Sequence, residues 1–209
     1  MTSPFNLFIA LLIVTLSGCA QQSRKMPTPG ITEQNLLQHQ QQVQAIGNWQ
    51  AIGKLGVKTP DDGGSATLRW QQQDTAYQIA FNGPLGQGNM SIEGEPGRVT
   101  FSGGSNPPQS AKTAEELMFN NTGWNIPVSQ LAYWVRGLPD PTKEVTHYTL
   151  NAHGFIEKLD QAGWKITYGE YINTQNLNEI IAMPGRITAE YREMRLTLLI
   201  REWKLGGTQ

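Results

Sequence analysis

The amino-acid sequence predicts a mostly β fold, in which one antiparallel sheet of about ten strands curls towards a barrel. Segments of alternating apolar and polar side chains recur along most of the chain. Turn-forming residues separate these segments, since the 209 residues include 22 glycines and 12 prolines. Helical spacing is confined to one stretch before the first strand and to two short stretches that interrupt the strands.

The first element is an apolar run over residues 5–16, which ends just before the only cysteine. About 12 residues are too few for a transmembrane helix, which needs roughly 20, so we expect residues 1–18 to be a cleaved signal peptide. The sequence Leu-Ser-Gly-Cys that ends at Cys19 resembles the lipobox of bacterial lipoproteins. That resemblance implies that Cys19 carries a diacylglycerol and an N-acyl chain, which together form a nearly permanent anchor. The alternative is a free or buried cysteine after a chance apolar run.

The residues on either side of this motif indicate the destination membrane and a tether. Ala20 follows the cysteine where an aspartate would favour the inner membrane, so the pattern resembles lipoproteins that are sent to the outer membrane. One departure is that residues 1–4 contain no lysine or arginine. Residues 19–30 are polar and contain prolines, which is typical of a flexible tether. Residues 31–209 then form a single domain that faces the periplasm.

Composition excludes several classes of function. Lys and Arg number 16 against 17 Asp and Glu, a net charge of −1, so we expect no nucleic-acid partner. No cysteine remains for an intramolecular disulfide or a cysteine-based metal site.

The first predicted element of the domain is an amphipathic helix that begins at Thr32 with a capping-box-like sequence and ends at Gly47. The residues that recur at helical spacing and form its narrow packing stripe are Leu36, Leu37, Gln40, Val43 and Ile46.

Alternation with a period of two then predicts a meander of strands around residues 49–57, 66–70, 77–81, 90–92 and 99–101. Residues 102–108 are expected to be a loop, because glycine, serine and proline dominate there. Capped helices begin after Thr113 and at Ser129. Strands resume around residues 148–150, 155, 164–168, 187–191 and 194–201.

Few residues suggest catalysis. His39, His147 and His153 are expected to be surface or turn histidines, although the last two flank one strand and a metal or catalytic role stays open. The acidic pairs at residues 61–62 and 115–116 are typical of a solvated turn and a helix start. We therefore expect no enzyme activity, no metal and no cofactor beyond the acyl chains on Cys19.

The segment from Gly83 to Gly88 places one aliphatic residue among turn formers. It lacks the Gly-Lys-Ser/Thr of a nucleotide-binding loop. Leu85, between Pro84 and Gly86, is predicted either to protrude into solvent or to fold back and cap the core.

Several segments together resemble the LolB family of outer-membrane lipoprotein receptors. They are the lipobox, the helix, and residues 49–56, 66–70, 83–86, 131–139 and 196–205. The resemblance covers essentially the whole chain. It implies a single incomplete antiparallel β-barrel of about ten to eleven strands, with helices over the opening and an apolar cavity. It also implies that Leu85, with Pro84 and Gly86, forms a membrane-insertion loop.

The same resemblance implies a function. Family members accept acylated lipoproteins from the periplasmic carrier LolA and insert them into the outer membrane. We expect this chain to do so as a monomer and without ATP, since no energy-coupling motif is present. The alternatives are a lipid- or glycolipid-binding lipoprotein with a similar half-barrel and a scaffold lipoprotein of the envelope.

A cavity for acyl chains would be lined by the inward face of the sheet and by the two short helices. Any of these side chains could instead serve ordinary helix-to-sheet packing. The candidates on the strands are Trp49, Leu68, Trp70, Ile79, Phe81, Trp164 and Ile166. The candidates on the helices are Leu117, Met118, Leu131 and Trp134, with Phe119 beside them in the expected lid.

Overall fold

A computed structural model describes residues 31–83, 88–103 and 106–206, which form one open sheet of 11 antiparallel strands. The strand order is β6-β5-β4-β3-β2-β1-β11-β10-β9-β8-β7, so β6 and β7 are the two free edges. The prediction of an incomplete antiparallel barrel is confirmed. The signal peptide, Cys19, the tether and the loop of Pro84, Leu85 and Gly86 lie outside the described residues.

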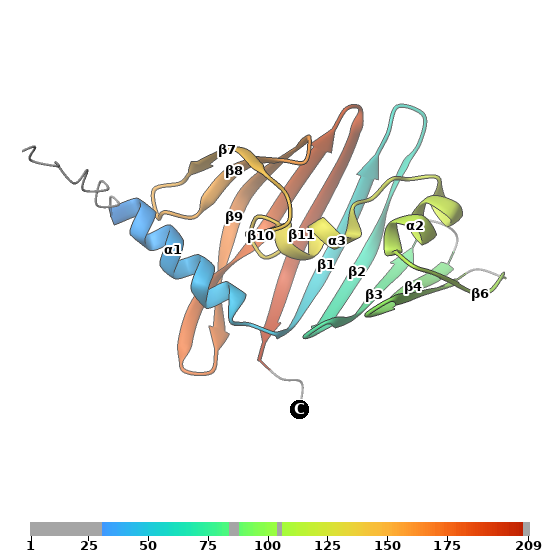
Figure 1. Ribbon diagram of the computed structural model, residues 1–209, viewed down its shortest axis with the longest axis horizontal. Helices are drawn as coiled ribbons and strands as arrows, with labels where there is room; N and C mark the ends of the chain where they lie inside the picture. Colours follow the sequence, from blue (N-terminus) through green and yellow to red (C-terminus); the bar gives the residue numbers. More distant parts are fainter. Residues whose placement is uncertain (1–30, 84–87, 104–105, 207–209) are drawn as a thin grey trace, which may run out of the picture.

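Three helices lie over one face of this sheet, which we call the inner face (Figure 1). Their bounds are α1 Ile31–Gln44, α2 Ala114–Thr122 and α3 Val128–Trp134. The strands of the first half are β1 Asn48–Lys58, β2 Gly63–Gln73, β3 Ala76–Gly83, β4 Gly88–Glu95, β5 Arg98–Gly103 and β6 Asn106–Ala111. Those of the second half are β7 Val145–Leu150, β8 Ile156–Gln161, β9 Trp164–Asn176, β10 Glu179–Tyr191 and β11 Met194–Leu205. In the described part of the chain, no helix is both long and apolar enough to span a bilayer.

The first and last strands pair at the centre of the sheet. β1 runs antiparallel to β11 from Trp49 opposite Leu205 to Lys58 opposite Arg195, with a bulge at Ile52/Gly53. A Cβ atom on Gly53 would overlap the carbonyl oxygen of Leu199, so only glycine allows the two backbones to approach this closely.

The inner face follows the predicted alternation. Leu55 and Val57 of β1 are buried on it, as are Leu68 and Trp70 of β2. Their neighbours on the opposite face are charged or polar, so a one-residue slip in register would expose the whole apolar set.

Two sequence-based expectations about local structure were wrong. The expected loop at residues 102–108 contains the start of strand β6. Pro107 and Pro108 are tolerated there because β6 is an edge strand and because its register with β5 shifts at Phe101/Gly103, opposite the two prolines. On α1, Leu37 is 52% exposed while His39 is buried.

His39 is held inside by specific contacts. Its Nε2–H donates to the carbonyl oxygen of Ala182 at 2.7 Å. Its ring centroid lies 4.4 Å from that of Phe155 and 6.0 Å from that of Tyr171. Burial lowers the pKa of the imidazole below its usual 6.5. The expectation of a surface histidine is therefore wrong for His39, which joins α1 to β10.

Gln161 is a second buried polar side chain that joins a helix to the sheet. It is fully buried at the end of β8. Its Oε1 accepts hydrogen bonds from Trp134 Nε1 at 2.8 Å and from the Asp140 backbone N–H at 2.9 Å. Its Nε2 donates to the carbonyl oxygens of Asp140 and Lys143, each at 2.9 Å. One side chain thus ties the end of α3 and the following loop to the sheet.

Replacing Gln161 by leucine should lower the free energy of unfolding by roughly 2–4 kcal/mol, because three buried hydrogen bonds and one part-buried hydrogen bond are lost at once. Urea denaturation followed by circular dichroism measures this change. The exposed Gln78 is a matched control: Gln78→Leu should stay within about 0.5 kcal/mol of wild type. Equal stability of Gln161→Leu and wild type would contradict the role given to this amide.

Stability should also fall as the pH drops through the range in which His39 titrates. The unfolded histidine binds a proton near pH 6.5, whereas the buried one binds it only at lower pH. The stabilisation by neutral His39 is therefore present above pH 6.5 and is lost as the pH falls towards the lower folded pKa. Urea unfolding at pH 7.5 and pH 5 should show a smaller loss for His39→Gln than for wild type. The exposed control His147→Gln should lose as much as wild type.

Candidate functional site

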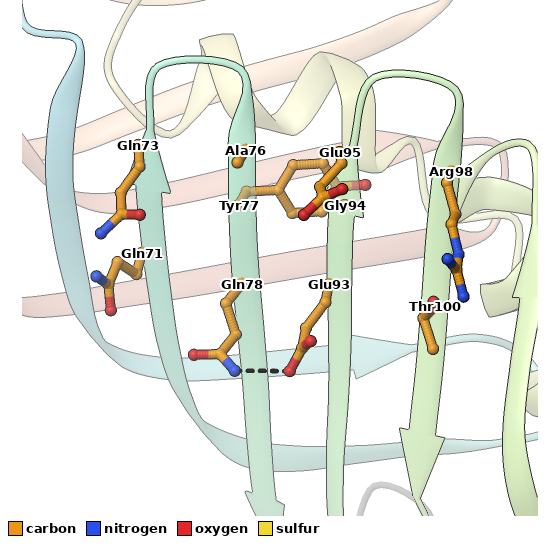
Figure 2. A pocket seen from close by; sticks show the side chains of 10 residues that line it. All are labelled: Gln71, Gln73, Ala76, Tyr77, Gln78, Glu93, Gly94, Glu95, Arg98 and Thr100. Atoms are coloured by element: carbon orange, nitrogen blue, oxygen red, sulfur yellow. Dashed lines mark hydrogen bonds between the residues drawn. The ribbon is translucent and has the colours of Figure 1, made fainter.

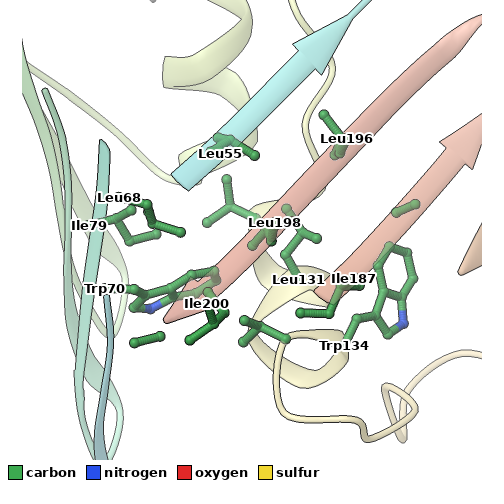
Figure 3. Close-up of a cluster of buried hydrophobic side chains, with 14 of the residues drawn as sticks. Leu55, Leu68, Trp70, Ile79, Leu131, Trp134, Ile187, Leu196, Leu198 and Ile200 are labelled. Atoms are coloured by element: carbon green, nitrogen blue, oxygen red, sulfur yellow. The ribbon is translucent and has the colours of Figure 1, made fainter. Parts of the chain in front are cut away.

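The inner face is apolar beneath the N-terminal part of α3. Side chains of β1, β2, β3 and β11 point towards Leu131 and Trp134 of α3 from the sheet (Figure 3). A small cavity of about 20 Å³ remains between them. Its lining consists of Leu55, Leu68, Trp70, Ile79, Phe81, Met118, Ile126, Val128, Leu131 and Leu198. This space suits about one water molecule and is far smaller than an acyl chain.

The structure brings six of the predicted lining residues around this cavity. They are Leu68, Trp70, Ile79, Phe81, Met118 and Leu131. The other five are buried outside it: Trp49, Leu117, Trp134, Trp164 and Ile166. Phe119 is 50% exposed and does not face the sheet as a lid residue would.

Four lining residues were not among the predicted ones. Leu55 and Leu198 lie on strands whose alternation was recognised, so the same period would have found them. Ile126 and Val128 lie at the approach to α3, where no periodic pattern marks them.

Helix α3 is attached firmly at its C-terminal end only. There Trp134 donates to Gln161, and the Tyr168 hydroxyl donates to the Trp134 carbonyl oxygen at 3.1 Å. Burial raises the pKa of Tyr168, so this hydroxyl keeps its proton. The N-terminal end has no side-chain cap at Pro127, and its polar link is the Ser129 N–H donating to the Glu115 carboxylate of α2 at 2.8 Å. This end of the helix covers the cavity through Val128 and Leu131.

A second hollow opens beside the covered cavity. It has a volume of about 400 Å³ and is lined by Gln44, Ile46, Gly47, Trp49, Gln72, Asp74, Ala132, Tyr133 and Arg136. We call it the Arg136 groove. The Arg136 guanidinium lies 5.7 Å from the ring centroids of both Trp49 and Tyr133, and its Nε donates to the Ala132 carbonyl oxygen at 3.0 Å. Within the described ranges no carboxylate forms an ion pair with it.

A third hollow, also of about 400 Å³, is polar and lies along β2 to β5 (Figure 2). Gln78 Nε2 donates to Glu93 Oε1 at 2.8 Å across two of these strands. Burial and the nearby Glu115 raise the pKa of Tyr77 to about 12. With the glutamate engaged by an amide and the phenol protonated, the hollow offers hydrogen bonds rather than an acid–base pair.

The described residues contain no cluster of three His, Cys, Asp or Glu side chains that could hold a metal ion. His147 lies in β7 and His153 in the turn before β8. The features that distinguish this molecule are therefore apolar: a sheet face, the helices that cover it, and a cavity between them.

Comparisons with known proteins place these features in a family. Residues 47–203 match the family described as outer membrane lipoprotein LolB. An outer-membrane lipoprotein LolB of Cellvibrio japonicus is 46% identical over 97% of this chain and 98% of its own length. An outer-membrane lipoprotein LolB of Nitrosococcus oceani is 36% identical over 95% of this chain and 96% of its own length.

Solved structures agree on the fold. A LolA superfamily protein of Nitrosomonas europaea superposes with a TM-score of 0.51 over 86% of this chain and 96% of its own, at 10% identity. A DUF1329 family protein of Desulfovibrio piger superposes with a TM-score of 0.57 over 85% of this chain and 93% of its own, at 7% identity. The sequence matches span the chain almost from end to end, and this protein belongs to the LolB family of outer-membrane lipoproteins.

Proposed function

We propose that this protein is an outer-membrane-anchored receptor that accepts acylated lipoproteins from a LolA-type periplasmic carrier and inserts them into the outer membrane without ATP. Membership of the LolB family supports a role in lipoprotein localisation at that membrane. The observation that carries the proposal further is the wholly apolar cavity beneath a helix that is fastened at one end. Acyl chains of the cargo would occupy that space after the helix moves.

The energetics of such a receptor are demanding. An acyl chain of about fifteen carbons that leaves water gains on the order of 10 kcal/mol, so the site must be large and apolar to hold it. Release to the membrane requires that the bilayer stabilise the acyl chain by at least as much free energy as the receptor does. In the closed state, Val128, Leu131 and Met118 occupy the inner face and replace the chain. When an acyl chain displaces these side chains, their own buried apolar area is lost. This loss lowers the net affinity of the site for the acyl chain and so makes release possible.

Helix α3 would move away from the sheet at the end that is held less firmly. The end of α3 at Trp134 is held by buried hydrogen bonds to Gln161 and Tyr168. The end at Val128 and the adjoining α2 are held mainly by apolar contacts, with one hydrogen bond from Ser129 to Glu115 between the two helices and one from Asn121 to Gln109 of β6. The apolar contacts can be exchanged for contacts with an acyl chain at little loss. The direction of transfer then comes from the different affinities of carrier, receptor and bilayer for the cargo. Each transfer proceeds without ATP as long as the cargo has a lower free energy at the next site than at the one before. A tethered receptor also makes the last step intramolecular.

A transfer assay tests the proposal. The chain from residue 19 onward, with Cys19→Ala to prevent acylation, is mixed with a carrier of the LolA superfamily loaded with radiolabelled lipoprotein. Transfer of the lipoprotein to this protein supports the receptor. Binding of free phospholipid with no uptake of lipoprotein would instead favour the lipid- or glycolipid-binding alternative.

Loading should change hydrogen exchange unevenly along the covering segment. A triacylated lipopeptide should speed amide exchange in residues 114–131, which must leave the inner face, and leave residues 156–161 of β8 unchanged. Mass spectrometry of the free and loaded protein measures both regions. Uniform protection of all three helices on loading would rule out the one-ended opening.

Leu85→Glu should leave folding and uptake from the carrier intact but reduce insertion of cargo into liposomes by about tenfold or more, because a carboxylate cannot enter the apolar part of the bilayer. Liposome flotation of the labelled cargo measures insertion. Leu177→Glu is the matched control, since Leu177 is an exposed leucine in the β9–β10 turn, at the other end of the strands from the β3–β4 connection. Equal insertion by Leu85→Glu and wild type would refute the role of this loop.

A further inference from the structure

Two buried indole groups at the centre of the inner face have no hydrogen-bond partner among the described residues. They belong to Trp49 of β1 and Trp70 of β2, each 3% exposed, and each Nε1 is buried without an acceptor within the described chain. Two other buried indoles have acceptors: Trp134 Nε1 donates to Gln161, and Trp203 Nε1 donates to the Pro184 carbonyl oxygen at 2.9 Å. A buried donor without an acceptor costs free energy, so a repeated exception at one place needs a reason.

The two indoles lie at the boundary between the apolar cavity and the Arg136 groove. Trp70 lines the cavity and Trp49 lines the groove. Their ring centroids are 5.6 Å apart, so the pair forms the wall between the two hollows. Helix α3 spans the same boundary, because Leu131 faces the cavity whereas Ala132 and Tyr133 face the groove. Movement of α3 would therefore join the two spaces at the tryptophan pair.

This arrangement matches a ligand with an apolar part, a row of carbonyl acceptors and a polar remainder. An acylated cysteine has that order of parts. Its acyl chains end in two ester carbonyls and one amide carbonyl, and a hydrated peptide follows. Neutral indole N–H groups are suited to neutral carbonyl oxygens, and the unpaired guanidinium of Arg136 adds further donors along the exit.

We propose that Trp49 and Trp70 bind the ester carbonyls of the acylated cysteine when cargo is loaded, with its acyl chains in the opened cavity and its peptide leaving along the Arg136 groove. This inference rests on the proposed receptor function and adds a polar subsite to it. The donors stay unpaired in the closed state, and part of the binding energy comes from satisfying them. Such a subsite distinguishes a lipoprotein from a plain hydrocarbon chain.

The test compares two lipopeptide probes that differ only at the carbonyls. One is N-palmitoyl-S-(dipalmitoylglyceryl)cysteine joined to a short fluorescent peptide, and the other is its dialkyl ether twin, which lacks both ester carbonyls. Fluorescence anisotropy with the chain from residue 19 onward carrying Cys19→Ala gives the two affinities. Wild type should bind the ester about tenfold more tightly, since two hydrogen bonds separate the probes.

Trp49→Phe and Trp70→Phe keep most of each ring but remove the N–H, so each should reduce this preference to about threefold or less. Trp203→Phe is the matched control: it loses an N–H that is used internally and touches Trp49, with ring centroids 5.6 Å apart, so it should keep the preference. If a variant does not fold, ¹⁵N-labelled tryptophan in the wild-type protein provides a second readout. The Trp49 and Trp70 indole signals should shift downfield with the ester probe and not with the ether.

Each result has a defined meaning. Equal wild-type affinity for ester and ether overturns the subsite and leaves the receptor function standing. A preference that persists in both phenylalanine variants, or indole signals that respond equally to both probes, also overturns it. Failure of both probes to bind overturns the acyl-binding function itself, together with this inference.

Discussion

The arrangement of this protein depends on how one short helix is attached to a sheet. Gln161, buried at the end of β8, uses both ends of its amide to hold Trp134 and the loop around Asp140. A buried amide with every group satisfied fixes geometry far more sharply than apolar contacts do, because hydrogen bonds are directional. Beyond this point α3 and α2 are kept in place mostly by burial of side chains. Burial is non-directional and can be exchanged for burial of something else.

That contrast lets one molecule be both stable and receptive. The centre of the sheet is held by the long ladders that join β1 to β11 and to β2. The inner face would expose a large apolar area if it were uncovered, so some cover must always be present. Helix side chains provide it in the closed state and leave only about 20 Å³ free. On the function proposed above, such a protein would need no large empty cavity, because its covering helices and its ligand would compete for the same surface.

Most of the fold could be predicted from the sequence because strands with one buried face alternate strictly. The inner-face residues Leu68, Trp70, Ile79 and Phe81 follow from that period alone. Strand β6 was missed because its two prolines are typical of loops, and its position at an edge together with a register shift against β5 permits them. His39 was wrongly predicted to lie at the surface because the buried face of the helix was assigned from the spacing of the other residues alone. A neutral imidazole that has a hydrogen-bond acceptor can also be buried among aromatic rings.

The site was harder to predict than the fold. Periodicity identifies which side chains face inward but not which of them leave a gap, since that depends on how the helices lie across the sheet. The hydrogen bonds of Gln161 join residues 134, 140, 143 and 161, and no local pattern marks them. The unpaired indoles of Trp49 and Trp70 likewise become evident only when every neighbour is placed.

The pairing of β1 with β11 has a consequence for how the protein is made. The middle of the sheet joins the first strand of the domain to the last, so the central ladder cannot close until the final dozen or so residues have been synthesised. Contacts so distant in sequence form slowly, and the incomplete chain cannot settle into its native state. This topology therefore suits a polypeptide that has to be unfolded when it crosses a translocation pore on its way to the outer membrane.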